Sequence, residues 1–177
     1  EIAAAAQAGK HVFVEKPFTL TRPSAERAIE ACRAAGITLQ VGFNRRYAPA
    51  YADMKRRIAA GEIGMLRHLE GNFSGPPSYQ TEPGNWRSNQ VESPGGGMTA
   101  RGCHVLDGMV HLAGLATEVF AVSERQQHDI DVDDTTSCLL RFAGGATGTL
   151  ATLVSLLEAT LRGVELEEIQ RNFYTHA

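Results

Sequence analysis

The stretch Gly9-Lys10-His11-Val12-Phe13-Val14-Glu15-Lys16-Pro17 decides the fold class of this chain of 177 residues. Its glycine stops an alanine-rich helical segment, an apolar β-rich run follows, and proline ends the run. A short apolar run between helices is typical of a buried parallel strand. The pattern then repeats, with an alanine-rich segment over residues 25–35 and a second apolar run over residues 37–43. This alternation predicts that residues 1–43 are the C-terminal part of a doubly wound α/β domain.

The rest of the chain, residues 44–177, has a different pattern. We expect a helix over 49–60, a strand over 65–73, a long loop over 74–94, a helix over 98–112, and strands over 118–126, 135–142 and 147–153. Strands adjacent in sequence favour antiparallel pairing. The second region is therefore predicted to be an α+β domain with a mostly antiparallel sheet, followed by a tail over 156–177 with the pattern of an amphipathic helix.

Composition excludes several classes of function. The formal net charge is −3, which gives no basic surface for nucleic acid or for an anionic membrane. No apolar run approaches the roughly 20 residues of a membrane span. The cysteines are odd in number and widely separated, so neither a zinc site nor a disulfide framework is expected: Cys32, Cys103 and Cys138. A reducing cytoplasm is the expected location.

Lys16 is the first candidate for chemistry. It follows the strand of residues 10–15, and ligands of open α/β sheets bind beyond the carboxyl ends of their strands. An ammonium group there can donate hydrogen bonds to a substrate oxygen. The alternative is a surface lysine in an ordinary turn between strand and helix.

His104 is the second candidate. It lies in the helix that follows the three glycines of residues 95–97, where the backbone can approach a ligand closely. Asp107 and His111 share its helix face, and a metal site was weighed for the three. Because these groups run along one helix rather than converging from several elements, we expect no metal. The alternative reading of His104 is a hydrogen-bonded core histidine.

Two polar pairs complete the candidate set. Asn44 and Arg45 follow the strand of residues 37–43 and could hold a polar substrate or the edge of a nicotinamide ring. Trp86 and Arg87 offer an apolar face and a fork of donors in the long loop. The alternatives are a helix cap followed by solvated arginines, and a lone aromatic that anchors the loop.

These stretches resemble the Gfo/Idh/MocA oxidoreductases. The resemblance is carried by residues 8–17, 39–46, 61–64 and 95–107, in matching order and spacing. It implies that residues 1–43 are the C-terminal part of a Rossmann domain and that residues 44–177 are an incomplete substrate and dimerisation domain. It also implies NAD or NADP as cofactor, with hydride moving to or from a sugar, sugar derivative or inositol-like polyol. The open sheet face would make a homo-oligomer.

The resemblance implies a role for each candidate residue. Lys16 would orient the reacting hydroxyl and share its proton, and His104 would be the partner acid or base. The cofactor-binding residues would be Glu15, Lys16, Pro17, Asn44 and Arg45. Trp86 and Arg87 would contact substrate together with His104.

Three departures from the family pattern leave other functions open. The chain opens at Glu1 in mid-helix, so the glycine-rich phosphate loop is expected to precede it, and the chain alone is expected to bind dinucleotide weakly. Ala100 stands where many members have aspartate, and the tail from residue 156 is atypical. An NAD-dependent glycoside hydrolase of the same fold and a non-catalytic, dinucleotide-binding or dimerising relative are therefore the alternatives.

Overall fold

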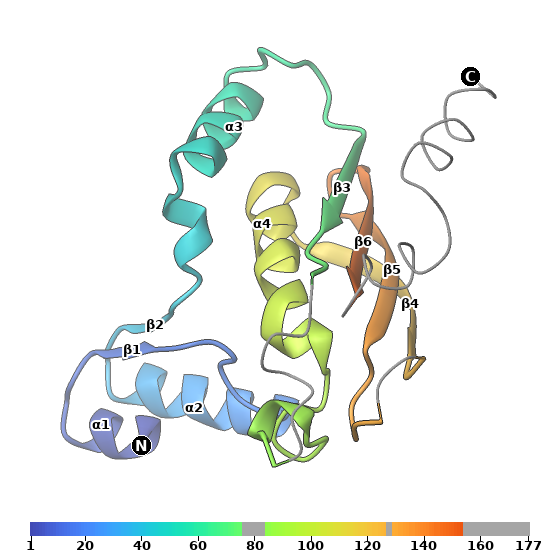
Figure 1. Cartoon of the computed structure of the whole chain (residues 1–177). Coiled ribbons are helices and arrows are strands. Elements are labelled where there is room, and N and C mark those ends of the chain that lie inside the picture. Colours follow the sequence, from blue (N-terminus) through green and yellow to red (C-terminus); the bar gives the residue numbers. More distant parts are fainter. Residues whose placement is uncertain (76–83, 127–128, 154–177) are drawn as a thin grey trace.

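The structure, a computed structural model, describes residues 1–75, 84–126 and 129–153. At its N-terminal end, α1 (Ile2–Gln7), β1 (Val12–Val14), α2 (Arg22–Ala34) and β2 (Leu39–Val41) form a two-stranded parallel sheet with its helices. Thr21 caps α2, because its hydroxyl accepts a hydrogen bond from the backbone N–H of Ser24. The predicted helix–strand–helix–strand order is confirmed, and Figure 1 shows these elements grouped at one end of the molecule.

A four-stranded sheet forms the second part of the described chain. It contains β3 (His68–Asn72), β4 (Ala116–Glu124), β5 (Thr135–Phe142) and β6 (Thr147–Leu153), in the order β3-β6-β5-β4. The β4–β5 and β5–β6 pairs are antiparallel, whereas β3 pairs with β6 in parallel. The mostly antiparallel sheet is thus confirmed. Its one parallel pair arises because the chain inserts a helix and two strands between β3 and β6.

Helices cover one face of this sheet. A 3-10 turn, η1 (Asn44–Tyr47), leads into α3 (Pro49–Ala59), and the predicted helix from residue 98 is a π-helical turn, η3 (Met98–Gly102), continued by α4 (Cys103–Ala113). Figure 1 shows α4 lying along the sheet, with α3 beside it. The buried core lies between α4 and the strands and contains Met109, Leu140, Phe142, Ala146 and Leu150.

The other face of the sheet carries exposed apolar side chains. Phe120, which faces Leu139 across the β4–β5 pair, is 67% exposed, and Leu139 itself is 53% exposed. Because residues alternate between the two faces of a strand, Val122 lies on the same face as Phe120. We call these three residues the open-face cluster.

Several predictions fall partly or wholly outside the described residues. The amphipathic tail over 156–177 does, and the loop over 74–94 is described only outside 76–83, with one 3-10 turn, η2 (Trp86–Ser88). The domain limits at 43/44 and 177 therefore stay a prediction. Among the described helices, none combines the length and the apolar character needed to cross a membrane.

Candidate active site

Lys16 lies directly after β1 and reaches the helix that carries His104. Its Nζ donates a 2.7 Å hydrogen bond to the carbonyl oxygen of Ala100, in the π-helical turn η3. π-Helical turns often occur at functional sites, because they displace backbone groups from the regular helical ladder. The Lys16–Pro17 peptide bond is cis. Lys16 is therefore a half-buried side chain anchored on the second part of the molecule.

His104 lies in the first turn of α4, against the N-terminal part of the chain. Its ring meets Phe43 edge-on, with ring centroids 6.2 Å apart. Burial, helped by the positive charges of Lys16 and Arg45, lowers the pKa of His104 below its usual 6.5. Its Nδ1 is buried and accepts or donates no hydrogen bond within the described part of the chain. A neutral imidazole next to an ammonium group is thus available to exchange a proton.

One open cavity of about 560 Å³ joins Lys16 and His104. It is lined by Glu15, Lys16, Gly42, Asn44, Arg45, Tyr47, Ala48 and His104. The structure therefore brings together five of the eight candidate residues around one space. Pro17 does not line this cavity, although it follows Lys16 directly.

Trp86 and Arg87 lie elsewhere. The Arg87 guanidinium stacks on the Trp86 ring, 4.2 Å from its centroid. Trp86 lines a different cavity, which is bounded by residues 84–92 and 129–131. The structure does not bring this pair to the cavity of Lys16 and His104, so their contact with substrate stays a prediction.

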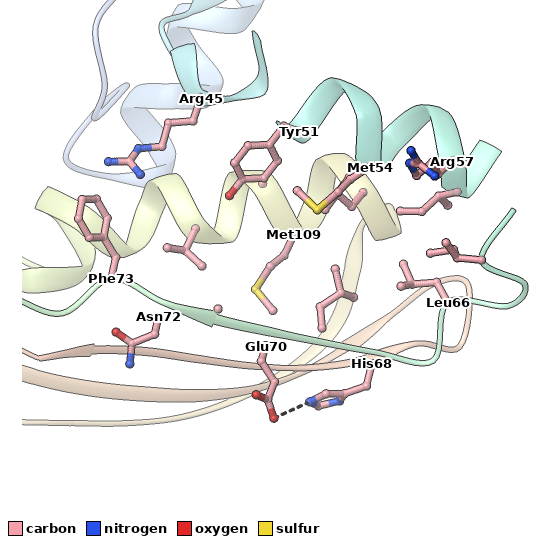
Figure 2. A pocket seen from close by; sticks show the side chains of 17 residues that line it. Arg45, Tyr51, Met54, Arg57, Leu66, His68, Glu70, Asn72, Phe73 and Met109 are labelled. Atoms are coloured by element: carbon pink, nitrogen blue, oxygen red, sulfur yellow. Dashed lines mark ion pairs between the residues drawn. The ribbon is translucent and has the colours of Figure 1, made fainter. Parts of the chain in front are cut away.

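A second cavity, of about 490 Å³, lies between α3, α4 and β3. Figure 2 shows Tyr51 and Met54 of α3 turned toward Met109 of α4, with His68 and Glu70 on the strand below. Its lining is mainly apolar, and Arg45 closes one end by stacking on Phe73, 4.3 Å from the ring centroid. Arg45 thus borders both cavities, but the acid–base groups border only the first.

Sequence reasoning missed the partner of Asp107. The carboxylate is buried in α4, and Arg46 holds it with a fork of hydrogen bonds, of which the two from Nε measure 3.0 and 2.7 Å. Arg46 is therefore not a solvated arginine. The available signal was a carboxylate on a mostly apolar helix, since aspartate is almost never fully buried unless it is paired.

The residues around the first cavity fit the nicotinamide end of a dinucleotide and an alcohol. The unbonded, buried Nδ1 of His104 and the polar side chains of Lys16 and Asn44 surround it, which are donors and acceptors for a hydroxyl or carboxamide group. No group of three or more possible metal ligands occurs in residues 1–75, 84–126 and 129–153. The chemistry that this arrangement supports is proton exchange at a bound polar group.

Two family models match the chain. One, described as an oxidoreductase family with an NAD-binding Rossmann fold, matches residues 2–43, and the other, the GFO/IDH/MocA C-terminal domain, matches residues 51–163. The chain belongs to the GFO/IDH/MocA family. The expected family and its Rossmann fold are thereby confirmed.

Relatives within the family act on sugars and inositols. Levoglucosan dehydrogenase of Pseudarthrobacter phenanthrenivorans is 30% identical over 83% of this chain and 44% of its own length. NAD⁺-dependent scyllo-inositol 2-dehydrogenase of Bacillus subtilis is 52% identical over 38% of this chain and 20% of its own length. The chain thus spans less than half of the length of these curated GFO/IDH/MocA relatives.

Solved structures give the same picture. A levoglucosan dehydrogenase in complex with NADH and levoglucosan superposes with a TM-score of 0.79 at 30% identity, over 86% of this chain and 43% of that one. A putative NADPH-dependent oxidoreductase of Desulfitobacterium hafniense reaches a TM-score of 0.81 at 30% identity, over 86% and 44%. The family is NAD-binding, and its solved members include complexes with NADH.

Proposed function

We propose that this chain carries the acid–base centre of an NAD(P)-dependent oxidoreductase that acts on a sugar, sugar derivative or inositol-like polyol. One observation carries the proposal: Lys16 and His104, which are distant in sequence, line one cavity at the end of a parallel strand. The named relatives support the substrate class, because their activities are those of levoglucosan and inositol dehydrogenases.

Lys16 and His104 divide the work on the alcohol proton. The hydrogen bond to Ala100 uses one N–H of the Lys16 ammonium and fixes its direction, which leaves two N–H groups for a substrate oxygen. His104, whose pKa burial lowers, accepts the proton as the carbonyl forms. NAD(P), when bound, supplies the carbon that accepts or returns the hydride.

Other residues shape the space around these two. Glu15, Asn44 and Arg45 line the cavity and are proposed to hold the nicotinamide end of the cofactor. Pro17 is proposed to shape the same pocket through the turn after Lys16. These groups sit at the ends of strands and turns, where rigid backbone keeps reacting atoms within about 3–3.5 Å of each other.

The test is turnover by the complete gene product that contains this sequence. NAD⁺ or NADP⁺ reduction is measured with a panel that includes levoglucosan, scyllo-inositol and myo-inositol. Lys16→Ala is expected to lower kcat about 100-fold or more, because the group acts mainly in the transition state. The matched control is Lys10→Ala, at an exposed lysine six positions earlier, which should leave kcat unchanged.

Two results would overturn the proposal. Unchanged kcat in Lys16→Ala removes Lys16 from the reaction. Tight NAD(H) binding without reduction across the whole panel favours the non-catalytic alternative that Ala100 suggests. Release of an aglycone without net reduction of the cofactor would instead favour the glycoside hydrolase.

We also propose that a second copy of the chain covers the open-face cluster. Aromatic and aliphatic side chains at this level of exposure mark a contact surface in soluble proteins. The cytoplasmic location stays a prediction.

A further inference from the structure

The ion pair between Arg46 and Asp107 connects two parts of the cavity wall. Arg46 belongs to η1, the same short turn as Asn44 and Arg45, which line the cavity. Asp107 belongs to α4, one turn beyond His104. The pair itself does not line the cavity, so any effect on chemistry passes through its neighbours.

The geometry of the pair is restrictive. The Asp107 side chain is only 6% exposed, whereas that of Arg46 is 39% exposed. Both carboxylate oxygens accept hydrogen bonds from the guanidinium, through Nε and Nη2. A forked arginine–carboxylate contact fixes relative orientation as well as distance, which a single hydrogen bond does not. The hydrogen bond with Asp107 raises the pKa of Arg46, so both groups stay charged.

We propose that Arg46 and Asp107 are a positioning pair for the reaction: their fork holds the turn that carries Asn44 and Arg45 at a fixed distance from the helix that carries His104. The inference rests on the proposed function, because it assigns the pair to that cavity. A displacement of about 1 Å at a reacting centre can cost about 100-fold in rate. A fork between the two walls limits such displacements.

The pair also sets the charge beside His104. The Lys16 and Arg45 cations face the imidazole and oppose its protonation, whereas the Asp107 and Glu15 carboxylates favour it. Arg46 neutralises Asp107 at close range. Removing the carboxylate and removing the guanidinium should therefore move the imidazole equilibrium in opposite directions.

The experiment is an NMR titration of the His104 imidazole in the chain itself, which needs neither cofactor nor turnover. Asp107→Asn should lower the pKa of His104 further, because a negative charge is lost and the Arg46 cation is left beside the ring. Arg46→Gln should raise it, since Asp107 is no longer neutralised. The matched control is Asp53→Asn, which breaks a 2.7 Å forked pair with Arg57 on α3, away from the cavity, and should leave His104 unchanged.

A purely structural tether predicts a different result. Loosening the helix would expose His104 to water in both variants, and its pKa would rise toward the usual value in each. A rise in Asp107→Asn, or no change in either variant, overturns the inference.

Arg46→Lys tests the geometry separately and protects against a variant that fails to fold. Lysine keeps the charge but loses the fork, so His104 should titrate as in the unmodified chain. In the complete gene product the same variant should lower kcat about 10-fold or more with a small change in KM. Unchanged kcat would overturn the positioning role. If the unmodified protein turns over no substrate, the proposed function fails, whereas the titration still decides whether the pair controls His104.

Discussion

The amino group of Lys16 donates a 2.7 Å hydrogen bond to the backbone carbonyl of Ala100. The contact joins the turn after β1 to the π-helical start of the His104 helix. Because the acceptor is a backbone oxygen, the alanine side chain plays no part in it. The lack of a carboxylate at position 100 therefore leaves Lys16 anchored, and it changes the charge of the site rather than its framework.

Ala100→Asp should raise the pKa of His104. The new carboxylate would lie four positions before the histidine, on the same helix face, and a nearby negative charge favours the imidazolium form. NMR titration of the imidazole measures the effect. Ala100→Asn is the control of equal size without charge, and an equal shift in both variants would attribute the effect to packing.

Acid should destabilise the fold partly through His104. Its pKa is lowered in the folded state, so the unfolded chain binds the proton more readily below about pH 6.5. This contribution is absent at higher pH and grows as the pH falls from about 6.5 through the lowered folded-state value. His104→Gln should lose less stability than the unmodified chain between about pH 7 and pH 5 in urea unfolding. Parallel pH profiles for the two proteins would contradict this.

Gly71→Ala should destabilise the second sheet. A β-carbon at Gly71 would lie 2.3 Å from Cγ1 of Val105, and a β-branched side chain in a helix has little freedom to move away. The expected loss is about 1–3 kcal/mol of unfolding free energy. Gly144→Ala is the control, since the nearest atom to its β-carbon would be 3.9 Å away. Equal stability of the two variants would show that β3 does not approach α4 this closely.

Two adjacent leucines of β5 should differ sharply. Leu140 is 3% exposed and Leu139 is 53% exposed. Leu140→Ala should cost about 2–5 kcal/mol, because it opens a cavity in the core, whereas Leu139→Ala should change stability by less than about 0.5 kcal/mol. Denaturant unfolding measures both. A large loss at Leu139 in dilute protein would place that side chain in a core.

Phe120→Asp should weaken self-association. The side chain stands in the open-face cluster, and a charge there would have to be desolvated between two copies. Sedimentation velocity should show a shift toward monomer, with an unchanged circular dichroism spectrum. Glu118→Gln, at an exposed position of the same strand, is the control. A monomeric unmodified protein at high concentration would contradict the proposed interface.

The order of elements was predictable because it depends on local patterns. Alanine-rich segments that end in glycine gave α1 and α2 their limits, and apolar runs marked β1 and β2. Lys16 was recognisable because strand ends in such sheets are ligand sites. These inferences need only residues close together in the chain.

The contacts between distant segments were not predictable. Nothing near Arg46 in sequence indicates that its partner is Asp107, 61 positions later. Likewise, the parallel pairing of β3 with β6 depends on how α4 packs, not on the sequence of either strand. The separation of Trp86 from the Lys16 cavity has the same origin, because a loop's path is set by tertiary packing.

The pairing of β3 with β6 has a consequence for synthesis on the ribosome. His68 bonds to Thr147, 79 positions later, so the first strand of this sheet emerges long before its only described neighbour. At about 5–20 residues per second, its edge waits about 4–16 s for a partner. The hairpin of β5 and β6 is the last to leave the ribosome, and until then the exposed edge of β3 is open to pairing with a neighbouring nascent chain.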